Sequence, residues 1–485
     1  MKKLLLAPLV SMLCIAPVLT AHSATVTWTG TGSATWNLTQ NNWSGGSPIG
    51  TRYVVGDNVI FDDGGISVNP TVTVQAAVNS VGSMTVNNTS GTYSFGSLIT
   101  SSSLNKSGAG TVSFTGNNAN QPTFSGGVTL SAGTLLSGAI FSSNINVAGN
   151  STLGAVSASS PTFGGTFTGS SQLTVTPSDS TRAVSFTGDV SGFTGTINSS
   201  AAGFINFNTG ASNLSSASVT LGGSTNFQGS VTGNILQIGQ ITTGSSNTLA
   251  KGTNGGSLTF QIGALNNASS IQGIITNNGT NGVVPVTGAT VNLSKVGSGV
   301  LTLSNANSYT GTTTVTTGTL LINGDQSLAT GTVTVGTSGT LGGGGFVGGA
   351  TTINGTLSPG TSPGLLTFNS SLTLAGTSNS LFEINGTNEG ITYDSVDILG
   401  SLTYGGTLSI DFGFTPVLLS TYNLFDFAGQ SGNFSSLVFM NSGFDGTFST
   451  STGILTVTAV PEPTTMALVG IGLGVLLLRR RSVQS

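Results

Sequence analysis

Short runs in which apolar and polar residues alternate recur along most of the chain, and glycine or asparagine separates them. Residues 300–304 read VLTLS and residues 313–317 read TTVTT. A period of two places alternate side chains on opposite faces of a strand. The pattern therefore predicts many short strands joined by turns. It offers no helical segment that could cross over a conventional parallel sheet.

Two stretches almost two hundred residues apart share one template. The first, from Leu104, reads LNKSGAGTVSFTGNNANQPTFSGGVTLSAGTLL, and the second, from Leu293, reads LSKVGSGVLTLSNANSYTGTTTVTTGTLL. Lys106 matches Lys295, and the glycines after each lysine also match. The first copy carries four extra residues within 117–122, which we expect in an outer loop. Fainter copies begin at residues 184 and 257.

Short strands on a recurrent spacing suggest a sandwich, a barrel or a parallel β-solenoid. We favour the solenoid, because some 435 residues without a linker are too many for one sandwich. Coils of about 20 to 30 residues would give on the order of 15 to 20 coils and a length of about 70 to 100 Å. The solenoid is expected over residues 66–458, with the clearest repeats at 104–138 and 293–325.

The composition agrees with such stacking. Glycine supplies 74 of 485 residues, only 5% of residues are charged, and the mean hydropathy is +0.28. Equivalent residues in neighbouring coils lie about 4.8 Å apart, so repeated charges would repel one another. Between residues 25 and 463 there are five basic and fourteen acidic residues, which argues against nucleic acid as a partner.

The template from Lys295 to Leu320 resembles the autotransporter-associated β-strand repeat, also called the passenger-associated transport repeat. Residues 35–65 and 353–410 are similar to the same family. The resemblance implies a parallel right-handed β-helix. Only about twenty-five residues follow the last strand-like segment, so we do not expect the membrane barrel by which an autotransporter exports itself.

The N-terminus has the layout of a secretory signal. Lys2 and Lys3 precede an apolar stretch at residues 4–19, and small residues follow at 21, 23 and 24. We predict a signal peptide at residues 1–24, recognised by the Sec export machinery, with the cleaved bond left open between Ser23 and Ala24.

Cleavage removes Cys14 and His22, the only cysteine and histidine of the sequence. The mature chain then cannot form disulfides, zinc or haem sites, or catalytic arrangements built on histidine or cysteine.

The C-terminal stretch 459–485 resembles a PEP-CTERM sorting signal. Its motif is Pro461, Glu462 and Pro463, followed by an apolar run at residues 466–478 and by Arg479, Arg480 and Arg481. As a helix this run would reach about 20 Å, against roughly 30 Å of bilayer hydrocarbon. The arginines would form a cytoplasmic stop.

The resemblance implies recognition and cleavage by an exosortase-type enzyme. We expect transient anchoring in the inner membrane and then a cell-surface or extracellular location. The alternatives are a plain tail anchor and a helix dimer packed through Gly470 and Gly474.

Trp28, Trp36 and Trp43 are the only tryptophans, and they gather at the mature N-terminus. They are candidates for stacking on sugar rings. We favour an N-terminal cap over residues 25–65, because the open end of a solenoid needs large side chains to close its core.

A few acidic residues are further candidates. Asp57, Asp62 and Asp63 could hold calcium, although such strings usually make turns. Asp394 and Asp397 could be paired carboxylates of a glycosidase, but on a strand they would face opposite sides. Glu383 is expected to point outward from a strand.

These observations predict a non-catalytic surface or matrix protein without cofactor or metal. It would act as a scaffold or adhesin associated with extracellular polysaccharide. A polysaccharide-degrading β-helix enzyme is the first rival, and it would need Arg52, Arg182, Lys251 or an acid pair to converge. A sugar-binding module built on the tryptophans is the second.

Overall fold

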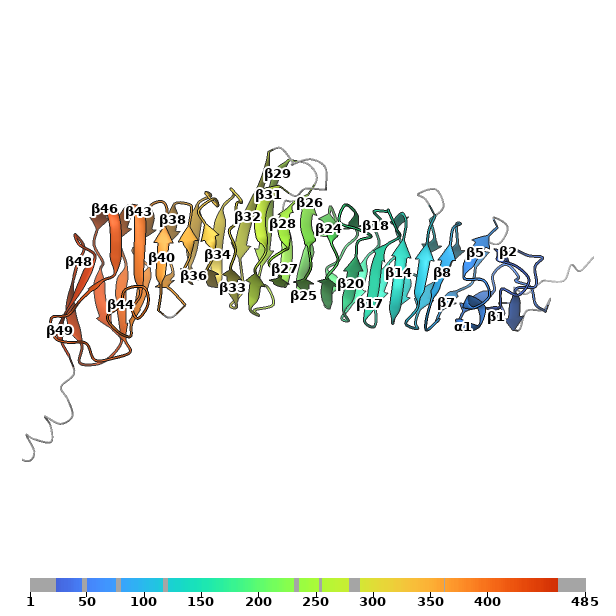
Figure 1. The fold of residues 1–485 in the computed structure, drawn as a ribbon, viewed down its shortest axis with the longest axis horizontal. Helices are drawn as coiled ribbons and strands as arrows, with labels where there is room; N and C mark the ends of the chain where they lie inside the picture. The colour runs from blue at the N-terminus through green and yellow to red at the C-terminus, as the bar shows by residue number, and fades with distance from the viewer. Residues whose placement is uncertain are drawn as a thin grey trace, which may run out of the picture.

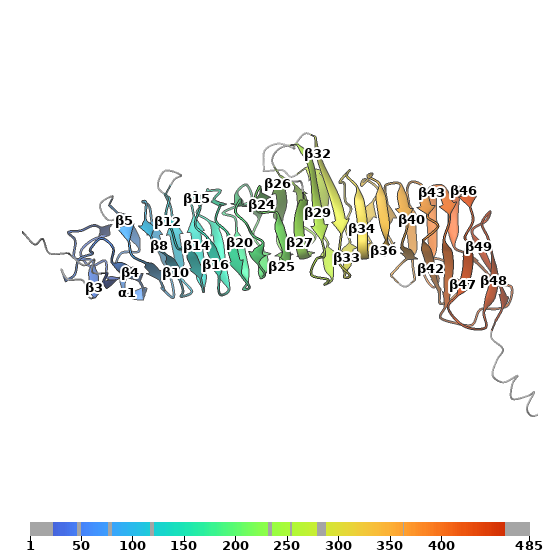
Figure 2. The ribbon, with the colours of Figure 1, turned by 180° about the vertical axis from the view of Figure 1, so that it is seen from behind.

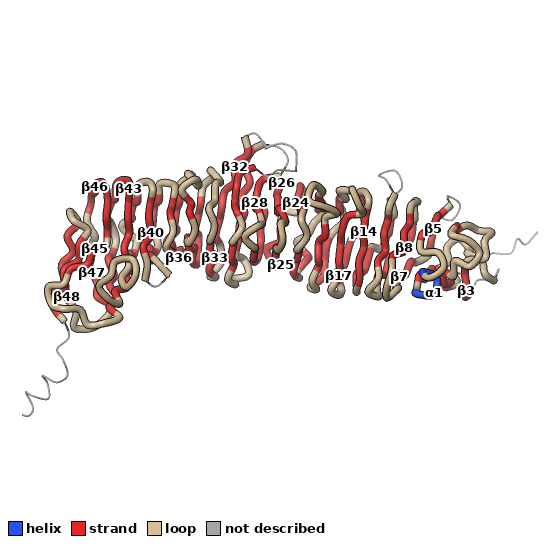
Figure 3. Tube along the Cα trace, viewed as in Figure 1, coloured by secondary structure: helices blue, strands red, loops and turns tan. Residues whose placement is uncertain are grey.

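The protein is a long rod whose strands run across its long axis (Figures 1 and 2). The computed structural model describes residues 23–45, 50–75, 80–116, 121–230, 235–252, 255–278, 288–361 and 363–460. The N-terminal and C-terminal parts lie at opposite ends of the rod. Strands and turns alternate along its whole length, and one short helix lies near the N-terminal end (Figure 3).

Parallel pairing between successive coils builds the rod. Strand β10 (Leu104–Lys106), for example, pairs in parallel with β7 (Met84–Val86) of the coil before and with β13 (Val128–Leu130) of the coil after. This is the β-helix that the alternating pattern predicted, so the expected fold class is confirmed.

Coil length varies more than expected. Thr152 and Thr174 are 22 residues apart and in register, whereas the shortest spacing is 16, from Gly342 to Ser358, and the longest is 38, from Thr35 to Thr73. The shortest coil contains four consecutive glycines at 342–345, and Gly343 adopts a φ of 107° that makes so tight a turn accessible. Of the expected outer loop, residues 117–120 lie outside the described residues.

The strands form walls that run along the rod. One wall consists, in spatial order, of β3 (Trp43–Gly45), β1 (Thr25–Trp28), β4 (Asn58–Phe61), β7, β10, β13, β16 (Ile145–Val147), β19 (Phe167–Gly169) and β22 (Gly192–Phe193). A second consists of β15 (Ile140–Phe141), β18 (Thr162–Phe163), β21 (Ala183–Phe186), β24 (Gly203–Asn208), β26 (Thr225–Ser230), β28 (Thr248–Lys251) and β31 (Ile274–Asn278). A short third consists of β6 (Ser80–Val81), β9 (Thr100–Ser101) and β12 (Thr123–Phe124).

The largest set of paired strands extends from the N-terminal coils to the C-terminal coils. In its N-terminal half it contains β2 (Thr35–Trp36), β5 (Thr71–Val74), β8 (Thr92–Phe95), β11 (Thr111–Phe114), β14 (Gly133–Ser137), β17 (Ser151–Ala155), β20 (Leu173–Thr176), β23 (Thr196–Ser199), β25 (Asn213–Leu221), β27 (Ile235–Thr243), β29 (Gly256–Ile262) and β30 (Ser269–Ile271). It continues with β32 (Ala289–Lys295), β33 (Val300–Leu303), β34 (Thr313–Ile322), β35 (Asp325–Gln326), β36 (Val333–Gly343), β37 (Phe346–Val347), β38 (Thr351–Ile353), β39 (Thr356–Pro359), β40 (Leu365–Phe368), β41 (Leu372–Leu374), β42 (Asn379–Ile384), β43 (Ser395–Tyr404), β44 (Thr407–Phe412), β46 (Phe425–Gly432) and β47 (Ser436–Phe439).

The core is a column of inward-facing apolar side chains. Strands such as β20 and β32 alternate buried and partly exposed positions. In the N-terminal half the column contains a continuous line of phenylalanine rings, with centroids 4.9 to 6.4 Å apart. This line consists of Phe61, Phe95, Phe114, Phe141, Phe163, Phe186, Phe207, Phe227 and Phe260.

The N-terminal end is closed by a strand of opposite direction. Strand β3 pairs antiparallel with β1, and β1 pairs parallel with β4. The boundary expected at residue 65 falls inside helix α1 (Asp63–Ile66), and β4 already pairs in parallel with β7. The parallel stacking thus begins within the N-terminal region, before the boundary expected between cap and solenoid.

The C-terminal end carries a small antiparallel sheet that the sequence did not reveal. Strands β45 (Thr421–Asn423) and β48 (Asp445–Ser449) both pair antiparallel with β49 (Ile454–Ala459). The alternation of residues 453–460 predicts a strand but does not give its direction. The last described residue, Val460, follows directly after β49.

Candidate functional site

The three tryptophans are buried at the N-terminal end of the core. Trp28, Trp36 and Trp43 are at most 1% exposed. Trp43 lies with its ring centroid 5.1 Å from those of both Trp28 and Trp36, in edge-on contacts. Tyr53 and Phe61 complete the cluster. Rings packed against one another in this way close the core, and their faces are not accessible for stacking on a sugar.

The N-terminal aspartates hold the main chain. Asp57 is buried and accepts hydrogen bonds from the amides of Ala24 and Val54, both at 3.0 Å. Asp62 is the N-cap of α1. Asp63 accepts two hydrogen bonds from Thr89, which lower the pKa of its carboxyl. No group of three acidic side chains in the described residues has a metal-binding arrangement.

Asp394 has a comparable structural role near the C-terminal end. It is 1% exposed, and its two oxygens accept hydrogen bonds from the amides of Gly364 and Glu383, both at 2.8 Å. Burial raises the pKa of its carboxyl to about 7, although the two amides oppose that shift. Glu383 lies at an outward position of β42, as expected.

Asp397 has an acidic neighbour that the sequence did not reveal. It lies directly opposite Asp426 in the pairing of β43 with β46. Burial raises the pKa of Asp397, and the negative charge of Asp426 raises it further. Both charges also raise the pKa of Glu389, after burial. A lone sequence does not show this pair, because the register between these two coils follows from a bulge between Ile398 and Ser401.

The repeated lysines are buried inside the turns that follow them. Nζ of Lys295 donates hydrogen bonds to the main-chain oxygens of Val296 and Gly297, both at 2.7 Å, and of Thr317 at 3.2 Å. Nζ of Lys106 donates to Ser107 and Gly108, at 3.1 and 2.5 Å. Burial lowers the pKa of each lysine to about 8. The recurring lysine therefore serves the structure, as its position in both copies indicated.

A glycine of the next coil covers each lysine. A Cβ at Gly318 would lie 2.7 Å from Nζ of Lys295 and 2.4 Å from the oxygen of Gly297. Gly133 has the same relationship to Lys106 and Gly108, at 2.6 and 2.3 Å. The spacing of lysine and glycines in the template thus describes one packing unit that extends over two coils.

The basic residues that a degrading enzyme would need do not gather. Arg52 lies in the first coil, where its Nε donates to Asn41. Arg182 lies between β20 and β21, near Asp179, and Lys251 ends β28. These residues belong to coils far apart along the rod. An acid pair does converge, at Asp397 and Asp426, but on other coils.

A line of small polar side chains follows the outer surface of the rod. Thr134, Thr152 and Thr174 are in register on successive coils, and each is partly exposed. We call this line the polar ladder. It consists of Thr92, Thr111, Thr134, Thr152, Thr174, Asn198, Thr220, Thr242, Ser270 and Thr302.

An open hollow of about 430 Å³ lies on the polar ladder. Thr134, Thr152 and Thr174 line it together with Asn150 and small residues such as Ala132. Two further open hollows, of about 240 and 340 Å³, are lined largely by serine, threonine and asparagine or by threonine, serine and glycine around Glu383. Hydroxyl and amide groups on an open surface suit an extended neutral ligand better than a reaction that needs water excluded.

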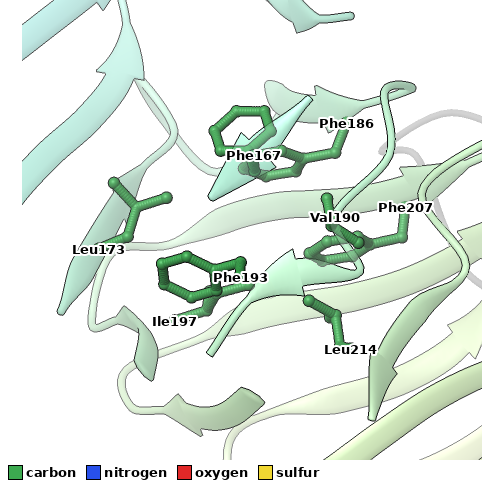
Figure 4. A pocket seen from close by; sticks show the side chains of 8 residues that line it. All are labelled: Phe167, Leu173, Phe186, Val190, Phe193, Ile197, Phe207 and Leu214. Atoms are coloured by element: carbon green, nitrogen blue, oxygen red, sulfur yellow. The ribbon is translucent and has the colours of Figure 1, made fainter. Parts of the chain in front are cut away.

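The enclosed cavity in the core carries no such chemistry. Figure 4 shows it among Phe167, Leu173, Phe186, Val190, Phe193, Ile197, Phe207 and Leu214. Its volume is about 10 Å³, and its lining is entirely apolar. A site of this size and polarity is at the limit for a single water molecule and stays dry.

The tail lies almost wholly outside the described residues. These undescribed residues include Pro461, Glu462 and Pro463 and the arginines at 479, 480 and 481. Among the helices within the described ranges, none has the length and apolar character needed to cross a bilayer.

Comparison with protein families identifies both sequence templates. The passenger-associated-transport repeat matches residues 104–136 and 293–322. The PEP-CTERM protein-sorting motif matches residues 459–481. The chain therefore contains the repeats and the sorting motif that the sequence indicated.

Comparison with characterised proteins finds the adhesin BmaC autotransporter of Brucella suis biovar 1 (strain 1330). It is 39% identical over 126 residues, which are 24% of this chain and 4% of that protein. The chain thus matches only a small part of its relative. Together, the sorting motif and the adhesin-type repeats mark an exported, surface-associated protein, and they favour a non-enzyme.

Proposed function

We propose that this chain is a non-catalytic scaffold or adhesin of the cell surface or extracellular matrix, which associates with extracellular polysaccharide. The polar ladder is the observation that supports the proposal most directly. It presents hydroxyl and amide groups at a repeat of about 4.8 Å along the rod. A long neutral polymer laid along such a line would meet the same groups coil after coil.

Multiplicity is the physical reason that a weak contact would suffice. A single hydrogen bond exchanged with water contributes little to affinity. Several equivalent contacts on one rigid rod add up, because the second and later contacts form within the same complex.

We also propose that an exosortase-type enzyme recognises the tail and cleaves it. The match of the sorting motif to residues 459–481 supports this step. Before cleavage the apolar run would hold the protein in the inner membrane, with Arg479, Arg480 and Arg481 on the cytoplasmic side. Sec-dependent export would precede it.

Mass spectrometry of the mature protein from its native host tests the tail. We expect a C-terminus near Pro463. A retained Arg481 would contradict cleavage and favour a plain anchor.

Binding of the mature chain to a panel of neutral and acidic polysaccharides tests the ladder. The triple variant Thr134→Val, Thr152→Val, Thr174→Val removes three hydroxyls from the hollow and keeps β-branched side chains. We expect a loss of binding of about tenfold or more.

The matched control substitutes valine for Thr85, Thr129 and Thr168. These threonines belong to a second outward line, on the wall of β7 and β10, in register through Asn105 and Asn146. Equal losses in both variants would contradict a role for the polar ladder.

The same incubations test the enzyme rival. New reducing ends or unsaturated products would contradict a non-catalytic function. The acid pair of Asp397 and Asp426 would then be the first group to substitute.

A further inference from the structure

An exposed apolar turn lies beside the point at which the tail leaves the rod. Val417, Leu418 and Leu419 are 77%, 52% and 69% exposed. The amide of Ser420 donates to the oxygen of Val417 at 3.0 Å, which makes residues 417–420 a β-turn with two leucines at its tip.

The turn keeps these leucines against its own local preference. Leu419 has a φ of 65°, in the left-handed region where glycine or asparagine is favoured. A large, exposed apolar side chain in such a position contributes little to the core. Residues that break a local rule in this way are found where function requires them.

Hydrogen bonds fix the turn to the strand that leads into the tail. The amide of Leu419 donates to the oxygen of Val457 at 2.9 Å, and the amide of Val457 donates to the oxygen of Ser420 at 3.0 Å. Val457 is three residues before Val460, the last described residue.

Chain length limits how far the apolar run can lie from this turn. Six residues separate Val460 from Met466, where the run begins. Six extended residues span at most about 20 Å. While the run is in a bilayer, the turn must therefore remain near the surface of that bilayer.

We propose that residues 417–419 dock on the lipid surface while the tail is inserted and so hold the C-terminal end of the rod against the membrane. The inference rests on the membrane stage of the proposed function. Docking would keep the sorting motif close to the membrane, where a membrane-embedded enzyme could reach it.

The contact would be apolar and not electrostatic. No lysine or arginine occurs between residues 296 and 478, whereas Asp411, Asp426 and Asp445 lie on strands of the C-terminal end. Anionic lipids would therefore not strengthen docking, and added salt would not release it.

Single-cysteine probes test the proposal on the full chain after signal removal, which has no cysteine of its own. The chain is reconstituted in phosphatidylcholine vesicles, with an environment-sensitive fluorophore attached at Leu418→Cys, at Leu473→Cys in the apolar run, or at Leu328→Cys. Leu328 is 69% exposed on a distant coil and is the matched control. A spin-labelled lipid in the bilayer is the quencher.

We expect the probes at 418 and 473 to shift to the blue and to lose at least about half their emission to the quencher, and the probe at 328 to do neither. A quenched probe at 473 with an unquenched probe at 418 would overturn docking and leave the tail proposal standing. A quenched probe at 418 with an unquenched probe at 473 would support a lipid-binding turn and overturn the inserted tail. If neither probe is quenched, both proposals fail.

The variant Leu419→Asn separates docking from folding. Asparagine accepts the positive φ more readily than leucine, so the melting temperature should stay unchanged or rise. The quenching at 418 should fall by at least half. Unchanged quenching would assign the contact to proximity alone and overturn the role of the leucine side chain.

Discussion

Nζ of Lys295 donates a hydrogen bond to the main-chain oxygen of Thr317, which lies one coil further along the rod (3.2 Å). The two other hydrogen bonds of this ammonium group remain in its own turn. A lysine has three donors in all, so Lys295 uses each of them to hold the turn and to tie it to the next coil.

Replacing Lys295 by methionine should destabilise the coils around it by about 2 kcal/mol, because three buried carbonyl groups lose their donor. Lys251→Met is the matched control. Lys251 has a buried stem but no hydrogen bond from its ammonium group within the described residues, so its substitution should be neutral or stabilising. Hydrogen exchange in β32 and β34 measures the effect. Equal losses in the two variants would contradict the bonding role of Lys295.

The buried lysines should make the protein more stable as the pH rises above 8. Burial lowers the pKa of Lys106 and Lys295 to about 8 in the folded chain, whereas an unfolded lysine titrates at about 10.4. Between these values the unfolded chain binds more protons, so the free energy of unfolding increases with pH. Above about pH 10 the buried tyrosines oppose this trend, since burial raises the pKa of Tyr309 to about 12. The double variant Lys106→Met, Lys295→Met should flatten the profile between pH 8 and 10.

Asp394 should produce the opposite slope in acid. Burial raises the pKa of its carboxyl to about 7, against about 3.9 when unfolded. Its contribution to stability is full below about pH 4 and is lost as the pH rises to 7. Urea unfolding of wild type and Asp394→Asn across this range measures it. A variant that keeps the slope would assign it to other carboxyls.

Gly318→Ala should be strongly destabilising, by about 3 kcal/mol. Its Cβ would lie 2.4 Å from the oxygen of Gly297, and its φ of 68° is unfavourable for alanine. Gly256→Ala has a φ of 94° but open space around the added atom, and Gly376→Ala has open space without a positive φ. Thermal unfolding should rank the losses in the order 318, 256, 376. A loss at 256 as large as that at 318 would assign the effect to conformation and not to close packing.

Asp397→Asn should stabilise the C-terminal coils by about 0.5 kcal/mol at neutral pH, because it removes one of two like charges that lie opposite each other. Asp189→Asn should act in the opposite direction. The amide of Ser191 donates to its carboxylate at 2.8 Å and lowers its pKa. Denaturant titration of both variants tests the contrast in sign.

The sequence predicts what repeats locally and misses what depends on the register between coils. Alternation in stretches such as residues 300–304 predicted the strands, and the shared template placed Lys106 and Lys295 at equivalent positions. The polar ladder escaped notice because its rungs have unequal spacing, 18 residues from Thr134 to Thr152 and 22 from there to Thr174. The pairing of Asp397 with Asp426 depends on a bulge, which local residue preferences do not encode.

The ends of the rod illustrate the same limit. Three tryptophans near the N-terminus indicated a place where large side chains gather, and the structure buries them. The antiparallel strand β49 looks in the sequence like any other strand of the solenoid, since alternation carries no information on strand direction.

Each strand of the solenoid pairs with the coil before and the coil after it, and the two chain ends lie at opposite ends of the rod (Figure 1). A pulling force applied between those ends would load the bonds of the outermost coil first and would peel coils away in sequence. Every step would release a length of chain set by one coil, between 16 and 38 residues. Such a filament would give way gradually under shear and would dissipate a sudden load that a single cooperative domain would have to resist at once.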